Sequence, residues 1–178
     1  MMRIFIVGYM GVGKTTIGKG LGKLLNIEFI DLDKYIQNKY RKTIPEIFEE
    51  KGEDGFRIIE RGALDEVSAF ENVIVSTGGG APCFFDNMEK MNASGVTVYI
   101  EADPEELANR LLASKTVRPL IVGKSREELI PFIEQHLSAR ERYYKQAHIV
   151  YKTDKLLTKD QVHLTIDGIA EKLKTLPK

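Results

Sequence analysis

Short apolar runs alternate along this chain with longer amphipathic stretches. The runs are rich in β-branched and aromatic residues, as buried strands are, and they lie at Arg3–Val7, Glu28–Asp31, Val73–Ser76, Val96–Ile100 and His148–Tyr151. The stretches between them carry apolar residues at helical spacing and lie at Thr15–Leu25, Gly55–Phe70, Pro104–Ala113, Arg126–Ala147 and Lys159–Lys174. Strands separated by helices pair through right-handed crossovers, so the pattern predicts an α/β fold with a parallel sheet and helices on both faces.

Size and composition narrow the class of protein. The 178 residues are enough for a sizeable core, and no repeat, low-complexity segment or linker divides them, so we expect residues 1–178 to form one domain. The formal net charge is zero and no basic run predicts a nucleic-acid surface. No apolar stretch is long enough to span a membrane. The single cysteine, Cys83, precludes an intrachain disulfide and suits a reducing cytoplasm, where we expect the protein.

The most specific motif joins the first predicted strand to the first predicted helix. Gly8-Tyr9-Met10-Gly11-Val12-Gly13-Lys14-Thr15 matches the phosphate-binding pattern G-x-x-x-x-G-K-[ST], in the strand–loop–helix context that the pattern requires. Its glycines let the backbone turn N–H groups toward an anion, and the following helix directs the positive end of its dipole there. Lys14 can reach the β- and γ-phosphates of a nucleotide, and the Thr15 hydroxyl can bind Mg²⁺. The alternative, a glycine-rich turn without a ligand, is much less favoured by a complete match.

Two carboxylates follow the second predicted strand. Ligands of parallel sheets bind beyond the carboxyl ends of the strands. Asp31 and Asp33 stand at that end, on the same side by strand alternation and near the phosphate loop. One can hold Mg²⁺ through water, and the other can orient or deprotonate a substrate hydroxyl. Asp33 can alternatively cap a helix that begins at Lys34, and one aspartate can do both.

Glycines and arginines supply further candidates for binding an anionic substrate. Gly78-Gly79-Gly80 follows the third strand, where backbone N–H groups can approach a ligand closely, although a turn without a ligand has the same composition. Arg57 and Arg61 share one helical face, and each can form a bidentate pair with a carboxylate unless it is simply solvated. Arg140 and Arg142 offer the same chemistry near the end of another helix. Spacing alone does not choose between the members of either pair.

A segment without helical periodicity lies between two predicted helices. Ser114–Lys124 mixes Ser, Lys, Gly and Pro, and we interpret residues 114–125 as a mobile lid. A lid benefits a phosphotransferase because it excludes water, which would otherwise accept the phosphoryl group. Arg118 in this segment can swing onto the transferring phosphate and stabilise its charge. The alternative is a basic surface loop.

In their order along nearly the whole chain, these features resemble the shikimate kinase family. The resemblance rests on Gly8–Thr16, Asp31-x-Asp33, Gly55-Phe56-Arg57, Gly78-Gly79-Gly80, Arg118-Pro119-Leu120, and Arg140 with Tyr144. It implies the three-layer P-loop fold of nucleoside-monophosphate kinases, with a five-stranded parallel sheet and a mobile lid. It also implies transfer of the γ-phosphate of ATP to the 3-hydroxyl of shikimate, on the route to chorismate and the aromatic amino acids.

The resemblance assigns a role to each motif position. The ATP phosphates would be held by Gly11, Val12, Gly13, Lys14, Thr15 and Thr16, with Arg118 closing over them. Mg²⁺ would be held by Thr15 and, through water, by Asp31. Shikimate would be bound by Asp33, Arg57, Gly79, Gly80 and Arg140, with both arginines on its carboxylate. Catalysis would rest on Lys14, Asp33 and Arg118.

The chain departs from the family pattern at two places. The family often has Arg-x-Pro-Leu-Tyr where this chain has Arg140-Glu141-Arg142-Tyr143-Tyr144, and counting back from the final tyrosine selects Arg140. The family also often has an arginine seven residues before the lid arginine, near the adenine. Leu111 occupies that position here and Arg110 is one residue away, so the predicted site leaves Arg110 out.

Two other functions compete with this prediction. One is a kinase of the same fold that acts on gluconate or a nucleotide, and the other is a nucleotide-dependent switch without catalysis. The chain has no clear base-reading pocket, and the ordered set Asp33, Arg57, Gly79 and Arg140 favours shikimate over gluconate. A silent relative would have lost acceptor residues that this chain keeps. The sequence therefore predicts a monomeric, Mg²⁺- and ATP-dependent small-molecule kinase.

Overall fold

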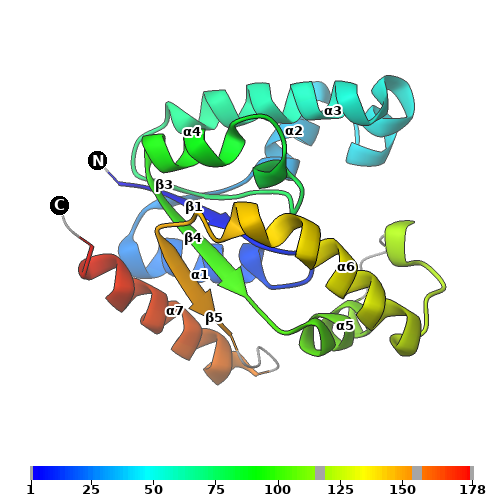
Figure 1. Ribbon diagram of the computed structural model, residues 1–178. Coiled ribbons are helices and arrows are strands. Elements are labelled where there is room, and N and C mark those ends of the chain that lie inside the picture. The colour runs from blue at the N-terminus through cyan, green and yellow to red at the C-terminus, as the bar shows by residue number, and fades with distance from the viewer. Residues whose placement is uncertain (1, 115–118, 154–157, 177–178) are drawn as a thin grey trace.

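The computed structural model describes residues 2–114, 119–153 and 158–176. A five-stranded sheet runs through its centre, in the order β2-β3-β1-β4-β5 (Figure 1). Every neighbouring pair is parallel, and the register pairs Phe5 with both Val75 and Thr97. The strands are β1 (Arg3–Val7), β2 (Glu28–Asp31), β3 (Val73–Ser76), β4 (Val96–Glu101) and β5 (Ile149–Lys152). The predicted parallel sheet and α/β class are therefore confirmed.

Helices cover both faces of the sheet. The α-helices are α1 (Lys14–Leu25), α2 (Leu32–Tyr40), α3 (Ile44–Ser68), α4 (Asn87–Ser94), α5 (Pro104–Ala113), α6 (Arg126–Tyr144) and α7 (Lys159–Lys174). Two short 3-10 helices complete the described elements. The first, η1 (Ala81–Cys83), follows the glycine triplet, and the second, η2 (Pro119–Ile121), precedes α6. In the described part of the chain, no helix is long and apolar enough to cross a membrane.

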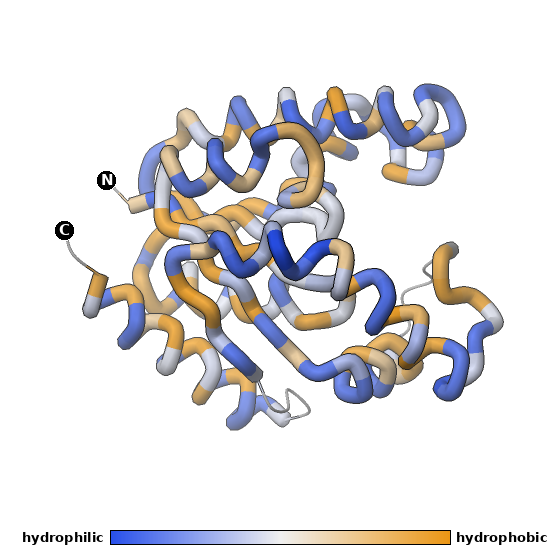
Figure 2. The backbone as a smooth tube through the Cα atoms, viewed as in Figure 1, coloured by the Kyte–Doolittle hydropathy of each residue, from blue (hydrophilic) through white to orange (hydrophobic). Residues whose placement is uncertain are grey.

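The alternation of side chains along the strands divides the core into two halves. Ile4 and Ile6 of β1 point to the side that α1, α5 and α7 cover, whereas Phe5 and Val7 point to the side of α2, α3 and α4. All four side chains are fully buried, as central strands of a sheet covered on both faces require. In Figure 2 the central strands are largely hydrophobic, while α3 and α7 alternate hydrophobic and hydrophilic turns.

Three helical segments were not predicted from the hydrophobic pattern. The helices α2 and α4 have 9 and 8 residues, too few for a clear amphipathic repeat. The helix α3 begins at Ile44 rather than near Gly55, after a capping box in which Thr43 and Glu46 bond each other's backbone. Gly52 interrupts it with a φ of 65°, and the polar run around this kink hides the helical period in the sequence. The helix α6 ends at Tyr144, three residues before the predicted end.

Candidate active site

The phosphate loop connects β1 to α1 with a backbone that only glycine adopts easily. Gly8, Gly11 and Gly13 have φ angles of 145°, 81° and 96°. Space is short as well, because a Cβ on Gly8 would lie 2.7 Å from the carbonyl oxygen of Ile100. Gly13 is the N-cap of α1 and supplies no side-chain hydrogen bond, so the helix begins on bare backbone N–H groups. This geometry suits the binding of phosphate oxygens.

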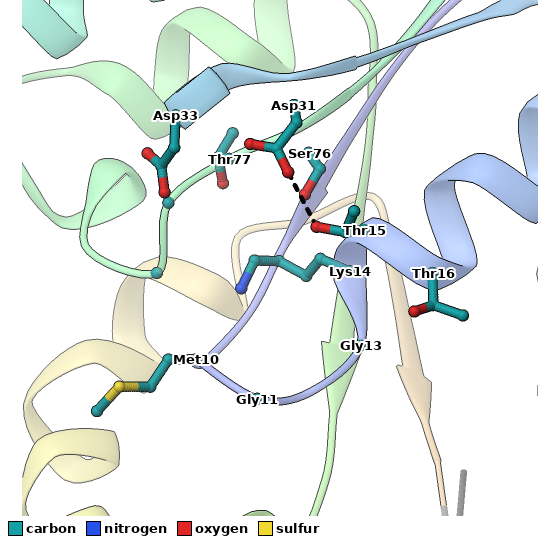
Figure 3. Close-up of a pocket in the computed structure, with 12 residues that line it drawn as sticks. Met10, Gly11, Gly13, Lys14, Thr15, Thr16, Asp31, Asp33, Ser76 and Thr77 are labelled. Atoms are coloured by element: carbon teal, nitrogen blue, oxygen red, sulfur yellow. Dashed lines mark hydrogen bonds between the residues drawn. The ribbon is translucent and has the colours of Figure 1, made fainter. Parts of the chain in front are cut away.

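Lys14 reaches back over this loop. Its Nζ donates to the carbonyl oxygens of Gly8 at 2.8 Å and Tyr9 at 3.0 Å, and only 9% of the residue is exposed. A cation is thereby held at the centre of the loop, beside the space into which phosphates would enter (Figure 3). This position suits contact with the β- and γ-phosphates, and that role of Lys14 stays a prediction.

The two predicted metal ligands lie together. The Thr15 hydroxyl donates to Oδ2 of Asp31 at 3.0 Å (Figure 3). Asp31 is the last residue of β2 and also the N-cap of α2, where its Oδ1 accepts from the Lys34 N–H at 3.2 Å. A hydroxyl and a carboxylate are hard oxygen donors, and Mg²⁺ typically takes one or two such protein ligands with phosphates and water completing its shell. The donor set therefore fits Mg²⁺ bound beside a nucleotide.

Asp33 lies just past the end of β2 and close to the phosphate loop, as expected, but in the first turn of α2 rather than in extended backbone. The cap of this helix, considered for Asp33 as the alternative, is Asp31. Asp33 lines a cavity of about 430 Å³ together with Lys14, Thr77 and Gly79 (Figure 3). Burial raises the pKa of Asp33, and the charge of Asp31 raises it further, while Lys14 and Arg57 oppose both effects. The carboxylate is thus made more basic at the edge of the phosphate site.

Arg57 lies beside the glycine triplet and is paired with a buried carboxylate. Its Nη1 donates to Oε2 of Glu60 at 2.7 Å, and the Glu60 side chain is 1% exposed. The guanidinium also lies 4.0 Å from the ring centroid of Phe84. Gly80 permits this placement, because a Cβ there would lie 2.7 Å from Nη2 of Arg57. The arginine and the glycine triplet therefore share one surface.

The neighbouring arginine of the same helix points elsewhere. Arg61 pairs with Asp86 and stacks on the ring of Phe85, whose centroid is 5.4 Å away. Asp86 is half-exposed, so this pair lies at the surface. Of the two arginines that spacing left open, only Arg57 adjoins the glycine triplet.

Arg140 approaches the phosphate loop from α6. Its guanidinium lies 5.7 Å from the ring centroid of Tyr9, a fully buried residue of the loop. The Tyr9 hydroxyl is in turn 3.2 Å from Nδ1 of His136, one turn before Arg140 on α6. Arg142 instead bonds the hydroxyl of its neighbour Tyr143 at 2.9 Å, on an exposed face. The structure thus directs Arg140, and not Arg142, toward the phosphate loop.

The lid is described only in part. Arg118 lies outside the described residues, as do residues 115–117. Of the predicted lid, Ser114 and residues 119–125 are described, and η2 lies among them. Leu120 and Val122 are exposed there, at 60% and 65%.

Several polar groups of the site were missed in the sequence. Arg110 was left out, yet its Nη1 donates to the carbonyl oxygen of Val12 in the phosphate loop at 3.0 Å, and its Nε pairs with Glu106 at 2.8 Å. The i, i+4 spacing from Glu106 to Arg110, one turn before the lid, was the available signal. Glu60 gave no signal, since nothing in a polar helix marks which glutamate is buried. Ser76, the last residue of the predicted third strand, and Thr77, which follows it, also line the cavity and were not among the predicted site residues.

Comparisons with known proteins agree with this geometry. The family model described as shikimate kinase matches residues 10–170. A shikimate kinase of Parabacteroides distasonis is 55% identical over 163 residues, which are 92% of this chain and 94% of the relative. One from Bacteroides fragilis is 49% identical over 173 residues, covering 97% of each chain.

Solved structures give the same result. The crystal structure of shikimate kinase from Bacteroides thetaiotaomicron has a TM-score of 0.94 and 48% identity, covering 97% of this chain and 98% of the other. Shikimate kinase from Acinetobacter baumannii, solved in complex with shikimate, has a TM-score of 0.82 and 32% identity, covering 100% of this chain and 96% of the other. Family model, close relatives and architecture agree over almost the full length of the chain, and the protein belongs to the shikimate kinase family.

Proposed function

We propose that this chain transfers the γ-phosphoryl group of ATP to the 3-hydroxyl of shikimate, giving shikimate 3-phosphate and ADP. The observation that carries the proposal is one cavity lined by both the phosphate loop and the Asp33 carboxylate. Arg57 adjoins the glycine triplet at Gly80, and Arg140 adjoins the loop at Tyr9. Shikimate combines a carboxylate with vicinal hydroxyls. Arginines are the matching partners for the first group and an aspartate for the second.

The phosphate loop provides the ATP side of the reaction. Gly11–Thr16 would hold the phosphates through backbone N–H groups, and Lys14 would follow the γ-phosphoryl group as its charge spreads in the transition state. Mg²⁺, held by Thr15 and through water by Asp31, would neutralise the β- and γ-phosphates. We assign Arg110 to this side as well, because it bonds the loop backbone at Val12.

Asp33 and the arginines provide the acceptor side. Asp33 would accept a hydrogen bond from the 3-hydroxyl and take its proton as the oxygen–phosphorus bond forms. Its raised pKa strengthens it as a base. Arg57 and Arg140 would hold the carboxylate, while Gly79 and Gly80 bring backbone close to the ring. The acceptor is fixed at both ends, which directs one hydroxyl at the phosphate.

The lid would complete the site. We propose that residues 114–125 close over ATP and that Arg118 then stabilises the transferring phosphoryl group. We further propose that the enzyme is a monomeric single domain of the cytoplasm, an environment that suits its lone thiol. Size-exclusion chromatography with light scattering tests the first statement, and cell fractionation tests the second.

The proposal is tested by ADP release with Mg²⁺-ATP and a panel of acceptors. We expect release to depend on shikimate, and gluconate and nucleoside monophosphates to give rates near the background. Release with gluconate alone would keep the phosphate site and reassign the acceptor. Release that ignores every acceptor would instead indicate a nucleotide-dependent switch.

A further inference from the structure

Tyr144, the last residue of α6, forms a hydrogen bond to the backbone of the glycine triplet. The residue is fully buried, and its hydroxyl donates to the carbonyl oxygen of Gly79 at 2.5 Å. Gly79 is packed on its other side against the phosphate loop, because a Cβ there would lie 3.3 Å from the Met10 nitrogen and 3.4 Å from the Gly8 oxygen. The backbone at Gly79 therefore contacts both the Tyr144 hydroxyl and the phosphate loop.

A fixed carbonyl also fixes the N–H group in the same peptide. The bond between Gly79 and Gly80 is planar, so its C=O and the Gly80 N–H point in opposite directions as one rigid unit. Glycine has no strong preference for one backbone conformation, so a run of three glycines can adopt many conformations. A buried hydrogen bond therefore sets a direction that the glycine sequence leaves open.

The Tyr144 ring is itself immobilised. It packs on Tyr99 of β4, with ring centroids 5.1 Å apart, and Tyr99 is 2% exposed. Burial raises the pKa of Tyr144, so the hydroxyl remains a proton donor at any physiological pH. The positive charge of Arg140 opposes this rise, since the guanidinium lies near the hydroxyl. Arg140 stands one turn earlier on the same helical face.

We propose that Tyr144 is a positioning residue for the acceptor, whose hydroxyl sets the Gly79–Gly80 peptide and its spacing from Arg140. The inference rests on the proposed function, because it assigns the acceptor side to the glycine triplet and Arg140. It extends that function by making the two acceptor-binding elements one unit, joined through a residue that is not part of the cavity lining. A purely structural Tyr144 would support the core without favouring either substrate.

The test compares Tyr144→Phe with Tyr99→Phe. Each variant removes one hydroxyl from the same ring stack, but only the first removes the hydrogen bond to Gly79. We expect Tyr144→Phe to raise the KM for shikimate about tenfold, equivalent to about 1.4 kcal/mol. The KM for ATP should stay within about twofold, and Tyr99→Phe should leave both constants within about twofold of the wild type.

Three outcomes would overturn the proposal. They are an unchanged shikimate KM in Tyr144→Phe, equal effects on shikimate and ATP, and equal effects of the two variants. Tyr144→Met, which keeps a buried apolar side chain of similar length, carries the same expectation if the Phe variant does not fold. The wild type is measured first, since its failure to use shikimate would refute the proposed function. An active wild type with an unaffected Tyr144→Phe would refute the positioning role alone.

Discussion

We expect the substitution Glu60→Gln to stabilise the protein and at the same time to weaken its use of shikimate. Glu60 is almost fully buried and pairs with Arg57 at 2.7 Å. Burial nevertheless raises the pKa of Glu60 from 4.5 to about 6, because desolvation outweighs the attraction of the guanidinium. The protein therefore keeps a charge in its active site at a cost to its own stability.

The magnitude follows from the pKa. A rise from 4.5 to about 6 corresponds to about 2 kcal/mol by which the folded state disfavours the charged carboxylate. Glutamine resembles the neutral acid in shape and charge. At pH 8 we therefore expect the free energy of unfolding of Glu60→Gln to be about 2 kcal/mol higher than that of the wild type.

The difference in free energy of unfolding between Glu60→Gln and the wild type should depend on pH and vanish in acid. In the wild type, the raised pKa supplies stability that is fully present below pH 4.5 and is lost as the pH rises through about 6. At pH 4.5 the two proteins should thus be nearly equal in stability. Urea denaturation at pH 4.5, 6 and 8 measures this difference directly.

Activity should move the other way. Arg57 would lose the charge of its buried partner, because the amide oxygen of glutamine accepts a hydrogen bond but forms no ion pair. Its other ion pair in the described part of the chain is with Glu53, which is 59% exposed and 3.3 Å away. We expect a shikimate KM about tenfold higher in Glu60→Gln, because Arg57 is held less firmly. Glu53→Gln is the matched control, with both stability and KM close to the wild type. A Glu60→Gln protein that is less stable than the wild type at pH 8 would show that the charged Glu60 carboxylate stabilises the fold.

The remaining predictions concern the residues assigned to each substrate. Asp33→Asn should lower kcat for shikimate about 10²- to 10⁴-fold while ATP binding, measured by calorimetry, stays within about threefold; near-normal turnover would remove Asp33 from the site. Arg140→Ala should raise the shikimate KM about 30-fold or more, whereas Arg142→Ala, on the exposed face, should not; equal effects would contradict the assignment of Arg140. Lys14→Ala should lower kcat about 10²- to 10³-fold in steady-state assays, since charge stabilisation in the transition state is lost, and a small effect would exclude that role.

The sequence predicted best what depends on neighbouring residues. The phosphate loop was recognised in full because its geometry requires glycine and lysine at fixed positions within one short segment. The five strands were found within one residue at each end. The central strands β1, β3 and β4 are buried and stand out as continuous apolar runs. The hydrophobic pattern did not show α2 and α4 because they are short, and a helix near Lys34 was considered only as an alternative role for Asp33. The first half of α3 was missed because Gly52 breaks its period.

The acceptor side could not be derived from spacing, because its residues are selected by contacts between distant segments. Arg57 and Arg61 are equivalent in the sequence, and they differ because one lies beside Gly80 and the other beside Asp86. Glu60 acquires its role only through burial. The choice of Arg57 over Arg61 and the burial of Glu60 depend on packing between α3 and the loop after β3. A local sequence pattern does not predict that packing.

The phosphate loop and the acceptor residues should bring ATP and shikimate together in one reaction. Identification of the products of Mg²⁺-ATP and shikimate by ³¹P nuclear magnetic resonance tests this expectation. We expect shikimate 3-phosphate and ADP in equal amounts, with no phosphate released to water. ADP with inorganic phosphate, in an amount that shikimate does not change, would contradict it.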